Sequence, residues 1–429
     1  MTYIPFFVAF ALLFAGIPVG LALLTSGLLY FGFFAHTLPM TSIIQNMIQN
    51  CMSTGLLTIP MFLFMGTVMN YCGLTARLLD WCNALVGHRK GGLAQVNVLL
   101  STVNGGICGS SGADAAMQCK ILVPEMVKKG YPIEFATAVT AASGLIAPMI
   151  PPGNALILYS TMTDISCVRM FMAGYLPGFL MCIAEMITVA IICNKNNYQS
   201  RAEKASWKEI LIETKRAFWA LVAIILLIVG LRFGFFNVHE GAVATSGLCI
   251  IVGLFIYKTI TVSDIPKMFI EAFHTTSNIM IMLMGSMVFG FYLTWARIPQ
   301  NLATFIMHIS SSKYVFMILS CVLMLIMGMF MDGTAMLMIV TPLLYPIAQK
   351  YGINLIHFGI IELICGYIGS LTPPVGGVMY TCCNITKVAI PDFFKAVKPF
   401  ILALLFVLLS VVFAPEIATW LPTAAYGPM

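Results

Sequence analysis

The chain has 429 residues, of which 60% are hydrophobic and 9% are charged, and its mean hydropathy is +0.96. Soluble domains carry roughly 25% charged residues, so this composition excludes a soluble enzyme or binding module and indicates a multi-pass protein of the lipid bilayer. The net charge of +6 reflects loop lysines and arginines that set membrane orientation, and we read no nucleic-acid binding from it.

Apolar stretches long enough to cross a bilayer recur along the chain. A crossing helix needs about 20 residues, so we expect spans at about 3–34, 52–73, 133–160, 168–193, 217–236, 242–257, 269–295, 355–382 and 400–420. The first has no basic n-region and no cleavage site, which favours a retained span. Two more polar stretches, 75–86 and 299–312, are either interfacial amphipathic helices or plain loops.

The segment 91–127 does not fit a simple crossing. It is too long for one span and too short for two, and its middle is polar. Basic residues flank it on both sides, His88-Arg89-Lys90 before and Lys128-Lys129 after, and such flanks prefer the cytoplasm. Because both ends then lie on one side of the membrane, we predict a re-entrant helical hairpin.

A corresponding segment in the second half, 314–346, has Asp332-Gly333-Thr334 at its centre. Each flank has a single lysine, Lys313 or Lys350. Counting spans from the basic loop 194–216, which belongs inside, places these flanks outside. We therefore predict a second hairpin of opposite orientation.

Two of the predicted spans are interrupted by consecutive prolines. Pro151-Pro152 falls inside 133–160, and Pro373-Pro374 falls inside 355–382. Proline removes a backbone donor and pushes the preceding residue out of the α region, so neither span is one continuous helix. Non-helical backbone at membrane depth is tolerated where protein or a water-filled cavity satisfies its polar groups. We expect each break to line a site.

Prolines and glycines of the two halves match at one ungapped offset. The offset is 222 residues (373 minus 151), and the matching pairs are Pro124 and Pro346, Gly130 and Gly352, Gly144 and Gly366, Pro151 and Pro373, Pro152 and Pro374, and Pro177 and Pro399. Shared composition alone does not account for six coincidences at one offset. The pattern predicts two repeats.

We therefore predict an all-α membrane protein built from two inverted-topology repeats. The first repeat, 1–216, contains the hairpin 91–127 and the broken span 133–160. The second, 217–429, begins with a linking span and contains the hairpin 314–346 and the broken span 355–382. Such repeats are typical of secondary transporters whose site lies between the repeats near the bilayer midplane.

Two motifs stand at the first hairpin and the second break. Residues 105–114 read Gly-Gly-x-x-Gly-Ser-Ser-x-Ala-Asp, and residues 369–376 read Gly-x-Leu-Thr-Pro-Pro-Val-Gly. With this order of elements the chain resembles, over nearly its whole length, the large membrane subunit of tripartite ATP-independent periplasmic (TRAP) transporters. Cys108 and Gly153 stand where a serine is common in that family.

The resemblance implies an elevator-type, sodium-driven importer of a small organic acid, such as a carboxylate or sugar acid, in the bacterial inner membrane. It also implies two partners. One is a small four-helix membrane subunit, and the other is a periplasmic substrate-binding protein. No organic cofactor is expected.

Sodium in a dry interior needs several oxygen ligands, and carbonyls freed where helices break suit it, together with hydroxyl and amide oxygens. The candidate ligands are Gly109, Ser110, Ser111, Pro148 and Ile150 in the first repeat, and Asp332, Gly333, Thr334, Gly369, Thr372 and Pro373 in the second. The alternative is that the glycines only permit close packing of helices, as small residues do in membranes.

The half-helix N-termini that follow the two proline pairs favour an anionic substrate. Candidate substrate contacts are Gly153, Asn154, Gly376 and Gly377 at these N-termini, with Asn104 and Asp114 in the first hairpin. Neither motif contains an arginine, so recognition of a carboxylate rests on backbone N–H groups, serine and asparagine side chains, and bound cations.

Three acids within apolar sequence have open interpretations. Asp114 attracts a cation, pairs with Lys120, or caps the returning half-helix. Glu185 and Glu362 are either transport residues or polar contacts between helices.

Two other classes of function are alternatives to a tripartite importer. A self-sufficient ion-coupled carrier of the divalent-anion type shares the repeat logic but needs no binding protein. An intramembrane enzyme needs a positioned nucleophile and base or a metal set, and no histidine falls within either motif. We therefore predict a transporter and not an enzyme.

Overall fold

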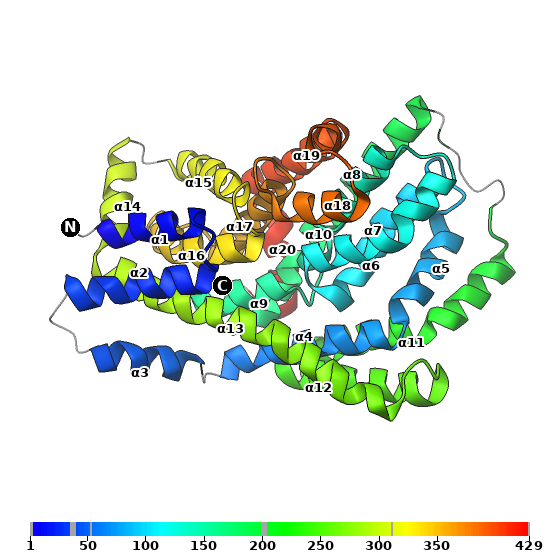
Figure 1. The fold of residues 1–429 in the computed structure, drawn as a ribbon, viewed down its shortest axis with the longest axis horizontal. Helices are drawn as coiled ribbons and strands as arrows, with labels where there is room; N and C mark the ends of the chain where they lie inside the picture. The colour runs from blue at the N-terminus through cyan, green and yellow to red at the C-terminus, as the bar shows by residue number, and fades with distance from the viewer. Residues whose placement is uncertain are drawn as a thin grey trace.

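The computed structural model of the chain describes residues 3–34, 40–51, 54–196, 198, 204–309 and 312–427. Within these ranges every regular element is helical and no strand occurs, which confirms the all-α prediction (Figure 1). The helices are α1 (Ile4–Phe14), α2 (Val19–Phe33), α3 (Met40–Cys51), α4 (Thr54–Tyr71), α5 (Leu74–Val86), α6 (Gly92–Cys108), α7 (Ser111–Lys128), α8 (Ile133–Ser143), α9 (Asn154–Thr163), α10 (Cys167–Lys195), α11 (Trp207–Arg232), α12 (Val238–Ile251), α13 (Ile265–Trp295), α14 (Ile298–Ile309), α15 (Lys313–Gly328), α16 (Gly333–Lys350), α17 (Leu355–Ser370), α18 (Gly377–Thr386), α19 (Ile390–Phe413) and α20 (Glu416–Tyr426).

Helices of the two halves correspond at the offset found in the sequence. α7 runs from Ser111 to Lys128 and α16 from Gly333 to Lys350, so both ends are 222 residues apart. Within a few residues the same offset pairs α6 with α15, α10 with α19, and α5 with α14. The fold thus repeats the order of elements that the sequence predicts. The repeat boundaries 1–216 and 217–429 stay a prediction.

Both predicted hairpins are present. α6 and α7 pack against each other and turn at Gly109-Ser110, and α15 and α16 pack against each other and turn at 329–332. In Figure 1 the first hairpin, in cyan, and the second, in yellow, enter from opposite ends of the long axis and point their tips toward the centre. The tips therefore approach the middle of the molecule.

Both predicted breaks are also present. In the first repeat, α8 continues into a 3-10 turn at Ala147–Met149, and α9 follows after the prolines. The segment 133–149 and α9 are bent by 44° relative to each other. α17 ends at Ser370, and α18 begins only at Gly377. Each break contains a cis peptide bond between its two prolines. The proline pairs interrupt the spans where the sequence predicted.

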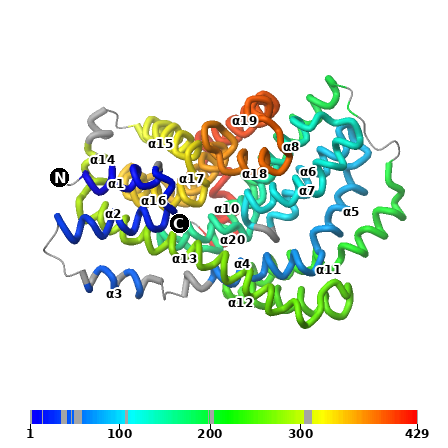
Figure 2. The backbone as a smooth tube through the Cα atoms, in the orientation of Figure 1, coloured from blue at the N-terminus to red at the C-terminus, as the bar shows by residue number. Residues whose placement is uncertain are grey.

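Long helices flank the hairpins. α2 packs along α13, and α12 packs along α4. Figure 2 shows α11 beside α5 at one end of the molecule, and α14 lies at the other end. Five helices of the described chain are each long and apolar enough to cross a membrane. Two bent pairs of helices are long and apolar enough when each pair is counted as one span. These pairs are α8 with α9, and residues 58–71 with α5.

The predicted span 3–34 is wrong as a single helix. The chain forms α1 and α2, which fold back on each other. Gly16 between them has φ +83°, a left-handed value that favours glycine, and Pro18 precedes the first residue of α2. The apolar composition is the same on both sides of the turn, so hydropathy alone joined the two helices.

The predicted span 400–420 is wrong in its bounds. α19 begins ten residues earlier, at Ile390, and ends at Phe413, and α20 is a separate helix. Pro415 explains the break, because the residue before a proline is disfavoured in the α region, and Ala414 has ψ 84°.

The remaining spans exist with shifted ends. α11 begins at Trp207 inside the loop predicted at 194–216, whose residues 197 and 199–203 lie outside the described chain. Residues 75–86 lie in α5 and residues 299–309 in α14, so the loop interpretation is wrong for these residues. α3 is a further helix that the sequence analysis did not predict.

Gly328 and Gly369 bring α15 and α17 into backbone contact. A Cβ atom at Gly369 would lie 2.6 Å from the Cα of Gly328 and 2.9 Å from the carbonyl oxygen of Leu325. No side chain fits between these backbones without moving one of the helices. The contact joins an arm of the second hairpin to its broken helix.

We expect Gly369→Ala to lower the midpoint of thermal unfolding in detergent, because overpacking of this kind costs about 1–3 kcal/mol. The matched control is Gly247→Ala in α12, where an added Cβ would meet nothing within 4 Å. That control should be neutral or slightly stabilising, since alanine favours a helix over glycine by about 1 kcal/mol. Equal midpoints for Gly369→Ala and the unaltered chain would contradict the close contact.

Candidate functional site

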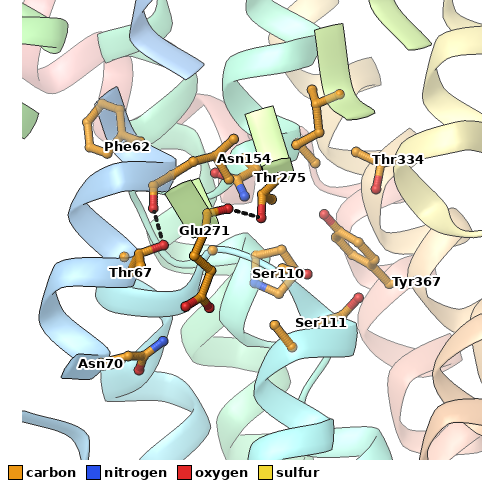
Figure 3. A pocket seen from close by; sticks show the side chains of 17 residues that line it. Phe62, Thr67, Asn70, Ser110, Ser111, Asn154, Glu271, Thr275, Thr334 and Tyr367 are labelled. Carbon is orange, nitrogen blue, oxygen red and sulfur yellow. Dashed lines mark hydrogen bonds between the residues drawn. The ribbon is translucent and has the colours of Figure 1, made fainter. Parts of the chain in front are cut away.

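A cavity of about 230 Å³ lies where the first hairpin tip meets its broken helix, α4, α13 and the tip of the second hairpin. Seventeen residues line it (Figure 3). In that view Phe62, Thr67 and Asn70 of α4 lie on one side, and Thr334 and Tyr367 lie on the other. The cavity is therefore shared by both repeats.

Six predicted site residues line this cavity. They are Gly109, Ser110, Ser111, Pro148, Asn154 and Thr334. Five come from the first repeat and one from the second, so segments far apart in the sequence converge at this cavity. Their roles as ligands stay a prediction.

The first hairpin tip is held against the break by main-chain contacts. Gly109 ends α6 with φ +56°, and its carbonyl accepts a hydrogen bond of 3.2 Å from the backbone N–H of Asn154. Ser110 then precedes the first residue of α7. The bond satisfies polar backbone groups on both irregular segments, which membrane depth requires.

The second hairpin tip has the equivalent contact. The backbone N–H of Val375 donates to the carbonyl of Met329 at 3.0 Å. Asp332 caps α16 by accepting from the backbone N–H of Thr334, at 3.0 Å, and from the hydroxyl of the same residue. A carboxylate at a helix N-terminus is favourable in the field of the helix.

A second cavity, of about 400 Å³, lies between this tip and the turn that joins α1 to α2. Asp332 and Thr334 line it together with Gly16 and Pro18. Thr334 and Ile279 line both cavities, so the two spaces are neighbours.

The other predicted site residues line neither cavity. They are Asn104, Asp114, Ile150, Gly153, Gly333, Gly369, Thr372, Pro373, Gly376 and Gly377. Several serve close packing, which was the alternative interpretation. Gly333 faces the ring of Tyr367, where a Cβ would be 3.0 Å away, and Gly376 lies against the carbonyls of Ser370 and Thr372.

Asp114 is fully buried and joins the two arms of the first hairpin. Its carboxylate accepts hydrogen bonds from Ser101 (2.7 Å) and Asn104 (2.7 Å) on α6 and from Gln118 (2.6 Å) on α7. Lys120 is exposed and is not a partner, so the pairing interpretation is wrong. The residue lies in the first turn of α7, where its charge also suits the helix dipole.

Glu362 is also buried, and it accepts a hydrogen bond of 2.8 Å from Thr341 on the neighbouring α16. This contact agrees with the interpretation of a polar link between helices. Both carboxylate oxygens of the buried Glu185 have no hydrogen-bond partner among the described residues. Neither acid lines the described cavities.

Sequence reasoning missed several polar residues that line the cavity. Thr67 and Asn70 of α4, Glu271 and Thr275 of α13, and Tyr367 of α17 all line it. Glu271 accepts a hydrogen bond of 2.9 Å from the hydroxyl of Tyr71, 200 residues away in sequence. The sequence signal that could have found this part of the lining is Glu271 itself, a single acid near the start of the apolar span predicted at 269–295.

The chemistry of the cavity is that of neutral oxygen and amide groups. Among the described residues no group of three or more histidine, cysteine, aspartate or glutamate side chains could hold a metal ion. The described lining includes no lysine or arginine, and Glu271 is its one charged side chain. Hydroxyls, amides and main-chain groups at helix breaks suit an alkali cation and a small polar solute.

Two helical hairpins that point into the molecule, two broken helices and a polar cavity between them define a membrane transport protein. The chain belongs to the family of the tripartite ATP-independent periplasmic transporter, DctM component, whose family model matches residues 6–417. The resemblance drawn from the two motifs is confirmed. The chain is a transporter permease subunit and not an enzyme.

Known relatives cover nearly the whole chain. It is 32% identical over 416 residues to the sialic acid TRAP transporter large permease protein SiaM of Vibrio cholerae, covering 97% of each chain. It is 32% identical over 402 residues to the 2,3-diketo-L-gulonate TRAP transporter large permease protein YiaN of Escherichia coli, covering 94% of each. The C4-dicarboxylate TRAP transporter large permease protein DctM of Pseudomonas aeruginosa is 32% identical over 367 residues, covering 86% of each.

Among solved structures, the YdaH transporter of Alcanivorax borkumensis is similar, with a TM-score of 0.65 over 88% of each chain. The sequence identity is 12%, so this likeness shows the fold alone.

We expect Asp114→Ala to destabilise the protein by about 3 kcal/mol or more, because it leaves several buried donors unsatisfied at about 1–3 kcal/mol each. Asp392→Ala is the matched control, since Asp392 also lies in the first turn of a helix but is exposed and paired only with Lys395. An exposed pair is worth about 0–1 kcal/mol. Thermal unfolding in detergent distinguishes the two, and equal losses would argue against the buried network.

Proposed function

We propose that this chain is the permease of a sodium-coupled secondary importer for a small organic acid delivered by a periplasmic binding protein. The observation that carries the proposal is the cavity of about 230 Å³ at which the first hairpin tip, its broken helix and Thr334 of the second hairpin meet. Inverted repeats that close on one such site suit alternating access. We place the protein in the bacterial inner membrane.

Sodium coupling is supported by the groups at the two breaks. Neutral oxygen atoms that suit a cation lie beside the first break, in the side chains of Ser110 and Ser111 and in the main chain of Gly109 and Pro148. Asp332 and Thr334 lie beside the second break. A carbonyl released from helical bonding is a suitable ligand for an alkali cation in a dry site. We assign these residues as the candidate sodium ligands.

An organic acid is supported by the helix α7, whose N-terminus lies at the cavity. The first intrahelical bond of α7 runs from the N–H of Asp114 to the carbonyl of Ser110, so the N–H groups before it have no acceptor within the helix. Ser111 and Ala113 of that first turn line the cavity. The named relatives transport sialic acid, C4-dicarboxylates and diketogulonate, which are all carboxylates.

Two partners are supported by the relatives. The names of the relatives that match over their whole length call them large permease proteins. The sialic acid TRAP transporter permease protein SiaT of Haemophilus influenzae is longer, and this chain covers 68% of it. We propose that a separate small four-helix membrane subunit supplies the rest, and that a periplasmic protein supplies the substrate.

The cavity also fits an elevator cycle. Its walls come from two groups of helices, the hairpins with their broken helices on one side and α4 with α13 on the other. In the proposed cycle the hairpin group carries the site past α4 and α13, which stay in place with α2 and α12 packed along them.

Uptake should require sodium. In proteoliposomes with the complete system, Asp332→Ala should raise the Na⁺ concentration for half-maximal uptake about tenfold or more, the loss expected when a charged ligand is removed. Ser111→Ala should raise it severalfold. The control is Ser410→Ala, because this half-buried serine of α19 donates to the carbonyl of Phe406 in its own helix and lines neither cavity. Equal uptake in sodium and choline would contradict the proposal.

Uptake should also require the binding protein. The basic segment 194–216, which includes the start of α11, belongs inside by its charge, so it is not available in the periplasm for capturing scarce substrate. Reconstituted alone or with the small subunit, the chain should transport little free organic acid. Adding the loaded binding protein should start uptake. Strong uptake of free acid by this chain alone would favour the self-sufficient carrier instead.

A further inference from the structure

Glu271 places a fixed negative charge on the wall of a cavity that, under the proposed function, receives an organic anion. Its carboxylate is held by the hydroxyl of Tyr71 at 2.9 Å. The nearest charges along the same helix are Asp264 and Lys267, which pair with each other at 2.7 Å. Lys267 pairs with Asp264, and Glu271 is the charged side chain of the described cavity lining.

The hydroxyls on the same wall present acceptors rather than donors. Thr275 donates its proton to the backbone carbonyl of Glu271 at 3.1 Å, and Thr67 donates to the carbonyl of Leu63 at 3.1 Å. Figure 3 draws both bonds. Each hydroxyl oxygen keeps only its lone pairs for the cavity. Together with Glu271 they make the α4–α13 wall rich in acceptors.

Donors come from the opposite group of helices and from one amide. The free N–H groups of the first turn of α7 belong to Ser111 and its neighbours. Asn70 accepts from Thr75 at 3.2 Å through its carbonyl oxygen, which leaves its NH₂ group to donate. The hairpin side of the cavity therefore offers a donor region that suits a carboxylate, and on α4 the Asn70 amide adds one donor.

A second carboxylate on the substrate would have no favourable place. Against the α4–α13 wall it would meet Glu271 and hydroxyl oxygens, with the neutral Asn70 amide as a donor and no lysine or arginine among the described lining residues. Two like charges a few ångströms apart repel strongly even at the effective dielectric of a protein surface. A hydroxyl or ammonium group in the same place would donate to Glu271 and Thr275.

We propose that Glu271 sets the substrate class of this permease. The cavity takes a monocarboxylate that carries hydroxyl or ammonium donors, and it rejects dicarboxylates. This inference rests on the proposed function, because it assumes that the cavity holds the transported acid. Among the classes of acid named for the relatives, it separates the sugar acids from the C4-dicarboxylates.

The test compares acids that differ only in the second carboxylate. Saturation-transfer NMR of the purified full chain in detergent measures weak binding of gluconate against glucarate, and of pentanoate against glutarate, in sodium and in choline. The unaltered chain should bind gluconate in sodium about tenfold or more tightly than glucarate, since one like-charge contact is worth at least that factor. Pentanoate, which lacks the hydroxyl donors, should bind more weakly than gluconate.

Glu271→Gln should reduce the preference for gluconate over glucarate by about tenfold, because the amide removes the charge but keeps the shape. Tyr71→Phe should keep the preference, since it removes a hydrogen bond and leaves the charge. Glu125→Gln is the matched control for charge, as Glu125 is exposed on α7, pairs with Lys128 and does not line the cavity.

Three results would overturn the inference. The unaltered chain binding glucarate as tightly as gluconate would show that Glu271 does not select. A Glu271→Gln variant that weakens sodium dependence for both acids and leaves their ratio unchanged would make Glu271 a cation ligand instead. If no acid binds in a sodium-dependent way, the proposed function fails as well. If binding depends on sodium but Glu271→Gln leaves the preference for gluconate over glucarate unchanged, only the inference about Glu271 fails.

Discussion

The constraint on which the rest of this structure depends is the need to satisfy main-chain polar groups where helices are broken inside a membrane. No water is available there to replace a lost helical bond. The chain meets this need by setting each hairpin tip against a break, with Asn154 donating to Gly109 in one repeat and Val375 donating to Met329 in the other. Pairing two irregular segments leaves both partly bonded and places their remaining groups side by side. A polar cavity in an apolar protein follows from this pairing.

Glycine explains how close these segments come. Gly109 takes a left-handed conformation that ends α6 and turns its carbonyl toward the break. Gly328 and Gly369 let the second hairpin lie against its broken helix at backbone distance. In a bilayer, where lipid is as apolar as leucine, such close contact is a main source of attraction between helices.

Much of this architecture was predictable because its signals are local. Consecutive prolines, glycine clusters and flanking charges placed both hairpins and both breaks within a few residues, and the offset of 222 residues revealed the repeat. The turn between α1 and α2 was missed because hydropathy is uniform across it, although Gly16 and Pro18 mark it. The α4–α13 wall was missed for a different reason. Tyr71 and Glu271 meet only through packing of helices 200 residues apart, and no local pattern reports such a contact.

The network around Asp114 has a mechanical consequence. One buried carboxylate is shared by Ser101 and Asn104 on one arm of the hairpin and by Gln118 on the other. Spreading the arms apart would strand that charge in a medium that solvates it poorly, which is far more costly than breaking a neutral bond. The first hairpin therefore behaves as one stiff piece rather than as two hinged arms. Any movement that exposes its tip has to carry α6 and α7 together.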